Sequence, residues 1–260
     1  MNTFSTKQLD AISSLIYGRF GISIRKEKLE RLEPRLQKMI ACEGYSGFDD
    51  LYGRLAAGDA DCLETLIKYI TTCHTFFFRE PDHFRLLVSF LNGQPNKNFR
   101  IWCAACSTGE EPYSVAMTLL DSGIDNFHII ASDINKKVLA YFNRGIYHEN
   151  RLNQVPDGIL QRYFTRVDDS FFAINRNLRS YISIKDINLM ETVRFPTPFD
   201  CVFCRNVFIY FDEQSRKRAV DTIVGNLKIG GLFFIGHAEV LLCQPENLKK
   251  VGSSVYRRLF

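Results

Sequence analysis

Residues 100–117 read RIWCAACSTGEEPYSVAM, and the fold predicted for the whole chain follows from this stretch. An apolar run at 101–103 is interrupted by the polar residues 107–109, and a second run, 112–120, has apolar residues at helical spacing. This order predicts a strand, a tight turn and a helix. In an open α/β sheet such a turn lies at the carboxyl end of a strand, where the helix exposes unpaired backbone N–H groups to a ligand. We therefore expect a ligand site here.

The turn also indicates which ligand it suits. A dinucleotide-binding turn needs several glycines so that the backbone can approach a pyrophosphate, but only Gly109 is present. Glu110 and Glu111 stand where a phosphate would otherwise meet the helix N-terminus, which disfavours a phosphate and favours a cation. S-adenosylmethionine fits, because it carries a sulfonium and an α-ammonium but no phosphate. Alternatively, the two glutamates only complement the helix dipole, worth about 0.3–1 kcal/mol each.

Composition limits the class of protein. With 260 residues, 46% of them hydrophobic, the chain can bury a full core. No segment approaches the ~20 continuous apolar residues of a transmembrane helix, and the polar N-terminus has no apolar signal-peptide core. We therefore expect a cytoplasmic protein whose eight cysteines are reduced. A net charge of +4 is too small to indicate nucleic acid binding by itself.

Residues 1–75 are predicted to be a small helical domain, with apolar residues at helical spacing and no strand pattern. The basic residues of its second helix recur at spacings of three and four, which places them on one stripe. A solvated surface and a docking surface for an acidic partner both fit this stripe. The stripe consists of Lys28, Arg31, Arg35 and Lys38.

From residue 84 onward, helical and strand patterns alternate. A second strand, 127–131, ends near Asp133, which lies 24 residues beyond Gly109. That offset matches the acidic residue that accepts hydrogen bonds from ribose hydroxyls in dinucleotide folds. An aspartate that caps the helix expected at 135–143 is the alternative.

The alternation of helical and strand patterns is interrupted between residues 147 and 187. Two strand-like runs, 170–174 and 178–184, flank the polar residues 175–177, and the second is expected to be the antiparallel hairpin partner of the first. This pattern predicts a small β insertion near residues 165–184. The strand and helix alternation then resumes with strands at 199–204 and 232–235.

Two CxxC pairs, Cys103 with Cys106 and Cys201 with Cys204, resemble metal-binding spacing. Both pairs fall on predicted strands or strand ends, where residues three apart point to opposite faces. We expect core thiols and no metal site.

The motifs taken together closely resemble the chemotaxis protein methyltransferases, the CheR family, in order and spacing over nearly the whole chain. The resemblance implies a Rossmann-like α/β S-adenosylmethionine-dependent methyltransferase sheet at 76–260, with a small antiparallel β insertion, preceded by the small all-α domain. It also implies an enzyme that methylates glutamate side chains of chemoreceptors and releases S-adenosylhomocysteine. The motifs are ITTCHTFFFRE (70–80), RIWCAACSTGEEPYSVAM (100–117), ASDINKKVL (131–139), RGIY (144–147), KDINL (185–189), PFDCVFCRNVFIYF (198–211) and GGLFFIGHAEVL (230–241).

The resemblance assigns site residues by position. Arg79 and Tyr210 are implied at the catalytic centre. The family's usual linker asparagine is Cys73 here, which removes one side-chain amide from the set. The positions implied for the cofactor are Cys73, Thr75, Arg79, Glu110 or Glu111, Asp133, Asn188, Leu189, Asn206 and Val207.

The reaction explains why no catalytic base stands out in the sequence. A glutamate side chain, with a reference pKa near 4.3, is ionised at pH 7 and can attack a sulfonium methyl group without a base. Residues 205–208, RNVF, also lack the Pro-Pro pair of amino methyltransferases that act on bases. Two alternatives remain: a cofactor-binding regulator without turnover, suggested by Cys73, and a nucleic-acid methyltransferase, suggested by a pI of about 8.6.

The expected partner is the acidic methylation region of chemoreceptor cytoplasmic helices, bound by the basic stripe. Members of the family that bind a receptor tether peptide have a glycine-containing loop in the β insertion, whereas the turn at 165–170 is short and lacks glycine. We therefore expect no tether binding. A monomer is expected, without nucleic acid and without insertion into a membrane.

Overall fold

The computed structural model describes residues 4–24, 29–71, 74–95, 98–241 and 245–260, with the side chains of 29–31 excluded. The chain forms two compact units. A helical unit contains residues up to 73 together with 210–218, and a sheet unit contains 74–209 and 219–260. Within the described ranges, no helix has the length and apolar character needed to cross a membrane.

The helical unit is built from α1 (Thr6–Phe20), α2 (Leu29–Glu43), α3 (Phe48–Ala57) and α4 (Ala60–Ile70). Its core consists of the apolar stripes of these helices, including Ile12, Leu36 and Leu66. Local sequence fixes the helix ends: the Ser5 hydroxyl accepts from the Gln8 N–H in a capping box, and the Asp59 carboxylate accepts from two N–H groups of α4. The predicted periodicity and the observed helices agree here.

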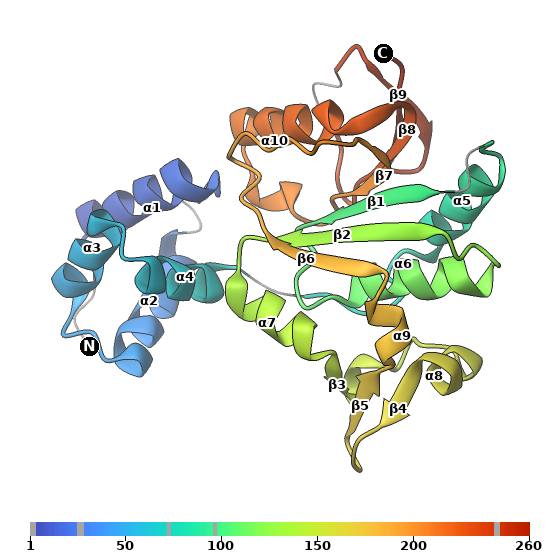
Figure 1. The fold of residues 1–260 in the computed structure, drawn as a ribbon. Coiled ribbons are helices and arrows are strands. Elements are labelled where there is room, and N and C mark those ends of the chain that lie inside the picture. The colour runs from blue at the N-terminus through green and yellow to red at the C-terminus, as the bar shows by residue number, and fades with distance from the viewer. Residues whose placement is uncertain (1–3, 25–28, 72–73, 96–97, 242–244) are drawn as a thin grey trace. The chain divides into compact units, whose positions relative to one another are not determined.

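A seven-stranded sheet forms the centre of the other unit, in the order β6-β2-β1-β7-β8-β10-β9 (Figure 1). The first five strands of this order pair in parallel, whereas β10 pairs antiparallel with both β8 and β9. The strands are β1 (Phe99–Ala104), β2 (Phe127–Asp133), β6 (Ile182–Asp186), β7 (Phe199–Phe203), β8 (Leu227–Phe234), β9 (Leu248–Gly252) and β10 (Val255–Arg258).

The helices of this unit are α5 (Pro81–Asn92), α6 (Glu110–Asp121), α7 (Lys136–Arg144), α8 (Asp157–Tyr163) and α9 (Arg176–Arg179), and α10 (Glu213–Gly225) continues into it from 210–218. Apolar residues of α5 and α6 share one core with Ile101 and Cys103 of β1. Trp102 points to the opposite face, where its ring packs against Phe195 and Phe199. Helices therefore cover a largely parallel, buried sheet, as residues 100–117 predict.

A small antiparallel sheet follows α7, in the order β3-β5-β4, with β3 (Ile146–His148), β4 (Phe164–Arg166) and β5 (Phe171–Ile174). The β insertion is present, but the predicted partner of residues 170–174 was wrong. Residues 176–179 form helix α9, and β6 joins the main sheet parallel to β2. Ile182 and Ile184 thereby line up with the buried Ile129 and Ala131, which offers more apolar contact than a two-stranded hairpin.

Candidate active site

The carboxyl ends of β1, β2, β6 and β7 lie at one edge of the sheet, because these strands are parallel neighbours. The turn after β1, Asp133 at the end of β2, Asn188 after β6 and the loop after β7 therefore meet there. Four segments that the sequence singles out are thus brought to one place.

The turn after β1 is shaped by positive φ angles at Ala105, Ser107 and Gly109. Gly109 has φ +94°, and a Cβ there would lie 2.1 Å from Cδ2 of Phe142, so both the backbone and the space require glycine. The Ser107 hydroxyl is buried at this turn without a hydrogen-bond partner among the described residues. A buried donor of this kind suits a bound polar ligand.

Asp133 joins the turn to the end of β2. One carboxylate oxygen accepts the Ser107 N–H at 2.8 Å, and the other accepts the Asn135 N–H at 2.9 Å. Burial raises the pKa of Asp133, and these backbone donors oppose the rise. The capping alternative was wrong, because Asn135 is the N-cap of α7 and accepts from Lys137 and Val138. With the Ile134 N–H as a third backbone donor, the roughly four acceptor sites of the Asp133 carboxylate leave capacity for a hydroxyl donor.

Glu110 and Glu111 differ in their surroundings. Glu110 is fully buried; its Oε2 accepts from the Thr108 hydroxyl at 2.7 Å, and its Oε1 forms an ion pair with Arg151. The Glu111 side chain is 13% exposed, and its Oε2 lies 3.2 Å from Nη1 of Arg205. Burial raises the pKa of Glu111 to about 7, although Arg205 opposes the rise. Glu111 is therefore the glutamate with capacity to meet a cation.

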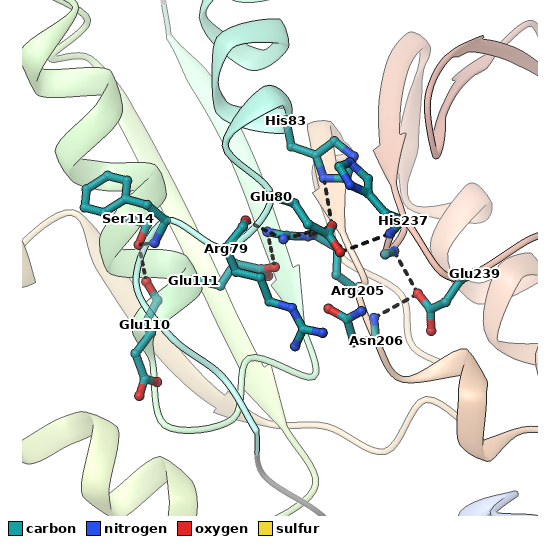
Figure 2. A network of polar contacts seen from close by, with 12 residues as sticks. Arg79, Glu80, His83, Glu110, Glu111, Ser114, Arg205, Asn206, His237 and Glu239 are labelled. Carbon is teal, nitrogen blue, oxygen red and sulfur yellow. Dashed lines mark hydrogen bonds and ion pairs between the residues drawn. The ribbon is translucent and has the colours of Figure 1, made fainter. Parts of the chain in front are cut away.

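Arg205 is the centre of a buried polar network (Figure 2). Its side chain is 2% exposed, and its Nε donates to Oε2 of Glu80 at 3.0 Å. Nη2 donates to the carbonyl of Arg79 at 2.5 Å, while Nη1 faces Glu111. The loop after β7 is thereby tied to the segment 79–80 and to the start of α6.

Glu80 also meets two histidines. Its Oε2 lies 3.4 Å from Nδ1 of His83, and its Oε1 accepts the backbone N–H of His237 at 3.0 Å. The ligand-type atoms of Glu80, His83 and His237 lie within 4.8 Å of one another. Both carboxylate oxygens of Glu80 are already engaged, by Arg205 and by the His237 N–H, and we assign no metal to this group. Burial, reinforced by Arg205, lowers the pKa of His83 to about 4.

The four cysteines of the CxxC pairs are buried free thiols, and burial raises the pKa of each. A raised thiol pKa means little thiolate at neutral pH, which disfavours metal ligation and nucleophilic chemistry.

Two family descriptions match the chain: "CheR methyltransferase, all-alpha domain" over residues 7–71, and "CheR methyltransferase, SAM binding domain" over residues 73–257. The chain belongs to the CheR methyltransferase family. A chemotaxis protein methyltransferase of Borreliella burgdorferi is 34% identical, covering 96% of this chain and 94% of its own. One of Escherichia coli is 35% identical, covering 94% and 88%. One of Klebsiella aerogenes is 37% identical, covering 94% and 87%.

The sheet unit is thus a CheR domain that binds S-adenosylmethionine, and the resemblance assigns most of the predicted site residues to it. Arg79 Nη1 donates to the carbonyl of His74 at 2.9 Å, and its guanidinium lies over the ring of Phe76. Thr75 is half-buried in the same linker, whereas Cys73 lies outside the described residues. Tyr210 belongs to the helical unit, where its carbonyl accepts from Ser23.

After β6, the Asn188 side chain accepts the N–H of Met190 at 3.0 Å, and Leu189 is 7% exposed. After β7, Asn206 has φ +61°, and Val207 is half-buried. The backbone of this CheR domain therefore presents both segments at the edge where Asp133 lies.

The basic stripe of the CheR all-α domain is only partly described. Arg35 Nη1 donates to the carbonyl of Ile70 at 2.6 Å, so this residue also joins α2 to α4. Lys38 is exposed. Lys28 and the Arg31 side chain lie outside the described residues.

Sequence reasoning missed three charged residues of the network: Glu80, Arg205 and Glu239. Each stands inside or beside a motif of the CheR resemblance, namely FFFRE, CRNV and GHAEV. Their burial was the missing information, because Arg205 and Glu239 are 7% and 6% exposed. A buried charge needs partners, and only the structure identifies those partners.

Proposed function

We propose that this chain is a protein-glutamate O-methyltransferase that transfers the methyl group of S-adenosylmethionine to glutamate side chains of chemoreceptors. The family supports the cofactor and the reaction class. The observation that carries the proposal is the edge of the sheet where Asp133 and Glu111 lie together at a turn without phosphate-binding glycines. These acceptors suit a ligand with hydroxyls and a cationic amino-acid end.

The residues fit the cofactor by their donors and acceptors. Asp133 would accept from the ribose hydroxyls, and Glu111 would pair with the α-ammonium. Asn188 and Leu189 would border the adenine, while Asn206 and Val207 would border the methionyl part. The buried Ser107 hydroxyl supplies a further donor at the turn.

S-adenosylmethionine supplies a methyl group on a sulfonium. A substrate carboxylate oxygen forms the new O–C bond as the C–S bond breaks, and the bonding pair returns to sulfur, so no proton is transferred. The chain's own residues therefore have to position two reactants and exclude water. Arg79 would hold the substrate carboxylate through its guanidinium. Tyr210 is retained as a second catalytic candidate.

We also propose the partner and its docking surface. The acidic methylation region of chemoreceptor cytoplasmic helices would meet the stripe of Lys28, Arg31, Arg35 and Lys38, in the cytoplasm and with a monomeric enzyme. The turn at 165–170 has no glycine, which supports independence from a receptor tether peptide.

Methyl transfer should be measured with radiolabelled S-adenosylmethionine and receptor cytoplasmic fragments, followed by mass spectrometry. Glutamate methyl esters on the receptor helices are the expected product. Cofactor binding without transfer would favour the regulator, and transfer to RNA or DNA but not to protein would favour the nucleic-acid enzyme.

A further inference from the structure

Glu239 is a buried carboxylate surrounded by backbone donors. It lies just after β8 and is 6% exposed. Its Oε2 accepts the N–H of Asn206 at 2.8 Å (Figure 2). Oε2 also accepts the N–H of Gly236 at 2.7 Å, and Oε1 accepts the N–H of Phe208 at 2.7 Å. These are charge-assisted bonds, which are stronger than those between neutral groups.

The bonds join two segments that are distant in sequence. Asn206 and Phe208 follow β7, whereas Gly236 and Glu239 follow β8, and these two strands are parallel neighbours. Both segments therefore leave the sheet at its carboxyl edge. The Glu239 side chain therefore links the loop after β7 to the segment after β8, in addition to the contacts that Arg205 makes on the other side of that loop.

The backbone of this loop is unusual at Asn206. Its φ is +61°, in the left-handed region that few residues other than glycine, asparagine and aspartate adopt. Its N–H donates to Glu239, and so does the N–H of Phe208 two residues later. Glu239 thus holds both ends of the short segment that contains Val207.

A second contact fixes the Asn206 side chain. A Cβ on Gly236 would lie 2.4 Å from Nδ2 of Asn206 and 3.0 Å from Oε2 of Glu239. The Asn206 side-chain amide therefore packs directly against the backbone of Gly236, where any other residue would place a Cβ. Asn206 is therefore held in two ways: its backbone N–H donates to Glu239, and its side chain occupies the space that a side chain at 236 would fill.

We propose that Glu239 is a positioning residue for cofactor binding, which acts through Asn206 and Val207 without touching the cofactor. This inference rests on the proposed function, because Asn206 and Val207 are assigned there to the methionyl part. Glu239 has no role of its own in the transfer step. Glu239 holds the loop after β7 in its binding conformation, so that no free energy is spent on ordering this loop when the cofactor binds.

The test compares Glu239→Gln with Asp168→Asn by calorimetric titration of S-adenosylhomocysteine. Glutamine replaces one acceptor oxygen by an amide donor that faces a backbone N–H. Asp168 is a matched control, because its Oδ1 accepts backbone N–H groups from Ser170 and Phe171 at 2.8 and 2.9 Å in the turn between β4 and β5. Glu239→Gln should raise the Kd at least about tenfold, and Asp168→Asn should leave it within about twofold.

Gly236→Ala provides a second variant that keeps the carboxylate. It should raise the Kd by a similar factor, since the added methyl group displaces the Asn206 amide. At saturating cofactor, both variants should recover most of the wild-type kcat, a pattern that general loss of folding would not give. Equal Kd values in folded wild type, Glu239→Gln and Gly236→Ala would overturn the inference. A wild type that fails to bind the cofactor would instead overturn the proposed function.

Discussion

Asp133 has a structural role beside the ligand role that we propose for it. Its two oxygens accept the N–H groups of Ser107 and Asn135, which links the end of β2 to the turn after β1. The Ile134 N–H is a third backbone donor, and a carboxylate has about four lone-pair sites. A ribose hydroxyl at the proposed site could therefore be accepted without loss of these bonds.

Asp133→Ala should weaken cofactor binding by about 1.5–3 kcal/mol, through the loss of hydrogen bonds to a charged acceptor. Calorimetry with S-adenosylhomocysteine measures this. The control is Asp59→Ala, which removes a carboxylate bound to the N–H groups of Asp61 and Cys62 in the helical unit. The control should lower stability without changing affinity. Unchanged affinity in folded Asp133→Ala would remove the ribose assignment.

Glu111 should make cofactor affinity depend on pH. Its pKa is raised to about 7, so the fraction of carboxylate, and with it the attraction for an ammonium, increases as pH rises from 6 to 8. Affinity should therefore fall as pH is lowered through 7, by up to about tenfold per pH unit below the pKa.

Calorimetry between pH 6 and 7.5, in buffers of different ionisation enthalpy, should show proton release on binding at the lower pH. Glu111→Gln should bind more weakly and lose the pH dependence. Glu110→Gln tests the assignment, because both of its oxygens are engaged by Thr108 and Arg151. If only Glu110→Gln lost the pH dependence of affinity, the ammonium would be assigned to Glu110 instead.

At this scale the sequence singles out residues whose local spacing is diagnostic. Asp133 is singled out by its offset to Gly109 and Glu111 by its position at a helix start, and their roles toward the cofactor stay predictions. Glu80 and Arg205 could not, because they are 125 residues apart and neither stands at a diagnostic spacing. Their pairing follows from tertiary structure alone.

At the scale of elements, the strand, turn and helix at 100–117 were predicted correctly, because apolar runs and breakers agree there. The strand at Ile182–Asp186 was given the wrong partner, since alternation reports that a strand exists but not which neighbour completes it. The strands β9 and β10 are absent from the predicted elements. β9 is one of the two edge strands, and its residues 249–251 are exposed, so it lacks a clear apolar pattern.

Gly109→Ala should destabilise the sheet unit by several kcal/mol, because the new methyl group meets the ring of Phe142 at 2.1 Å and the φ is +94°. Gly123→Ala is the control, since Gly123 has φ +75° and no atom within 4 Å of its added Cβ. Gly123→Ala should cost about 1 kcal/mol from the backbone alone. Urea unfolding measures both, and equal losses would show that Phe142 does not constrain the turn.

At the scale of the molecule, the two family descriptions together span both units, and the charges that we propose to act in function are divided between them. The ion pairs of Arg205 with Glu80 and Glu111 in the sheet unit are buried, whereas the described part of α2 exposes Lys38. Buried pairs are weakly screened by salt, and exposed charges more than a Debye length away are strongly screened. Cofactor binding and receptor docking should therefore respond differently to ionic strength.

Charge reversal on the stripe should lower kcat/KM for the receptor and leave cofactor affinity unchanged. Lys38→Glu is preferred to a change at Arg35, because Arg35 donates to the Ile70 carbonyl and its loss would disturb the helical unit. Lys68→Glu is a control with the same change in net charge: Lys68 is on α4 and 50% exposed, and its surface ion pair with Glu43 at 3.5 Å is worth only about 0–1 kcal/mol.

If docking is electrostatic, Lys38→Glu should reduce kcat/KM more than Lys68→Glu at low salt. The difference should shrink as the Debye length falls from ~10 Å at 0.1 M to ~3 Å at 1 M. Rates measured with receptor fragments at several salt concentrations, together with the Kd of S-adenosylhomocysteine, decide between the two interpretations of the stripe. Equal receptor methylation by Lys38→Glu and the wild type at low salt would mean that Lys38 is ordinary solvated surface, because a docking charge acts most strongly where screening is weakest.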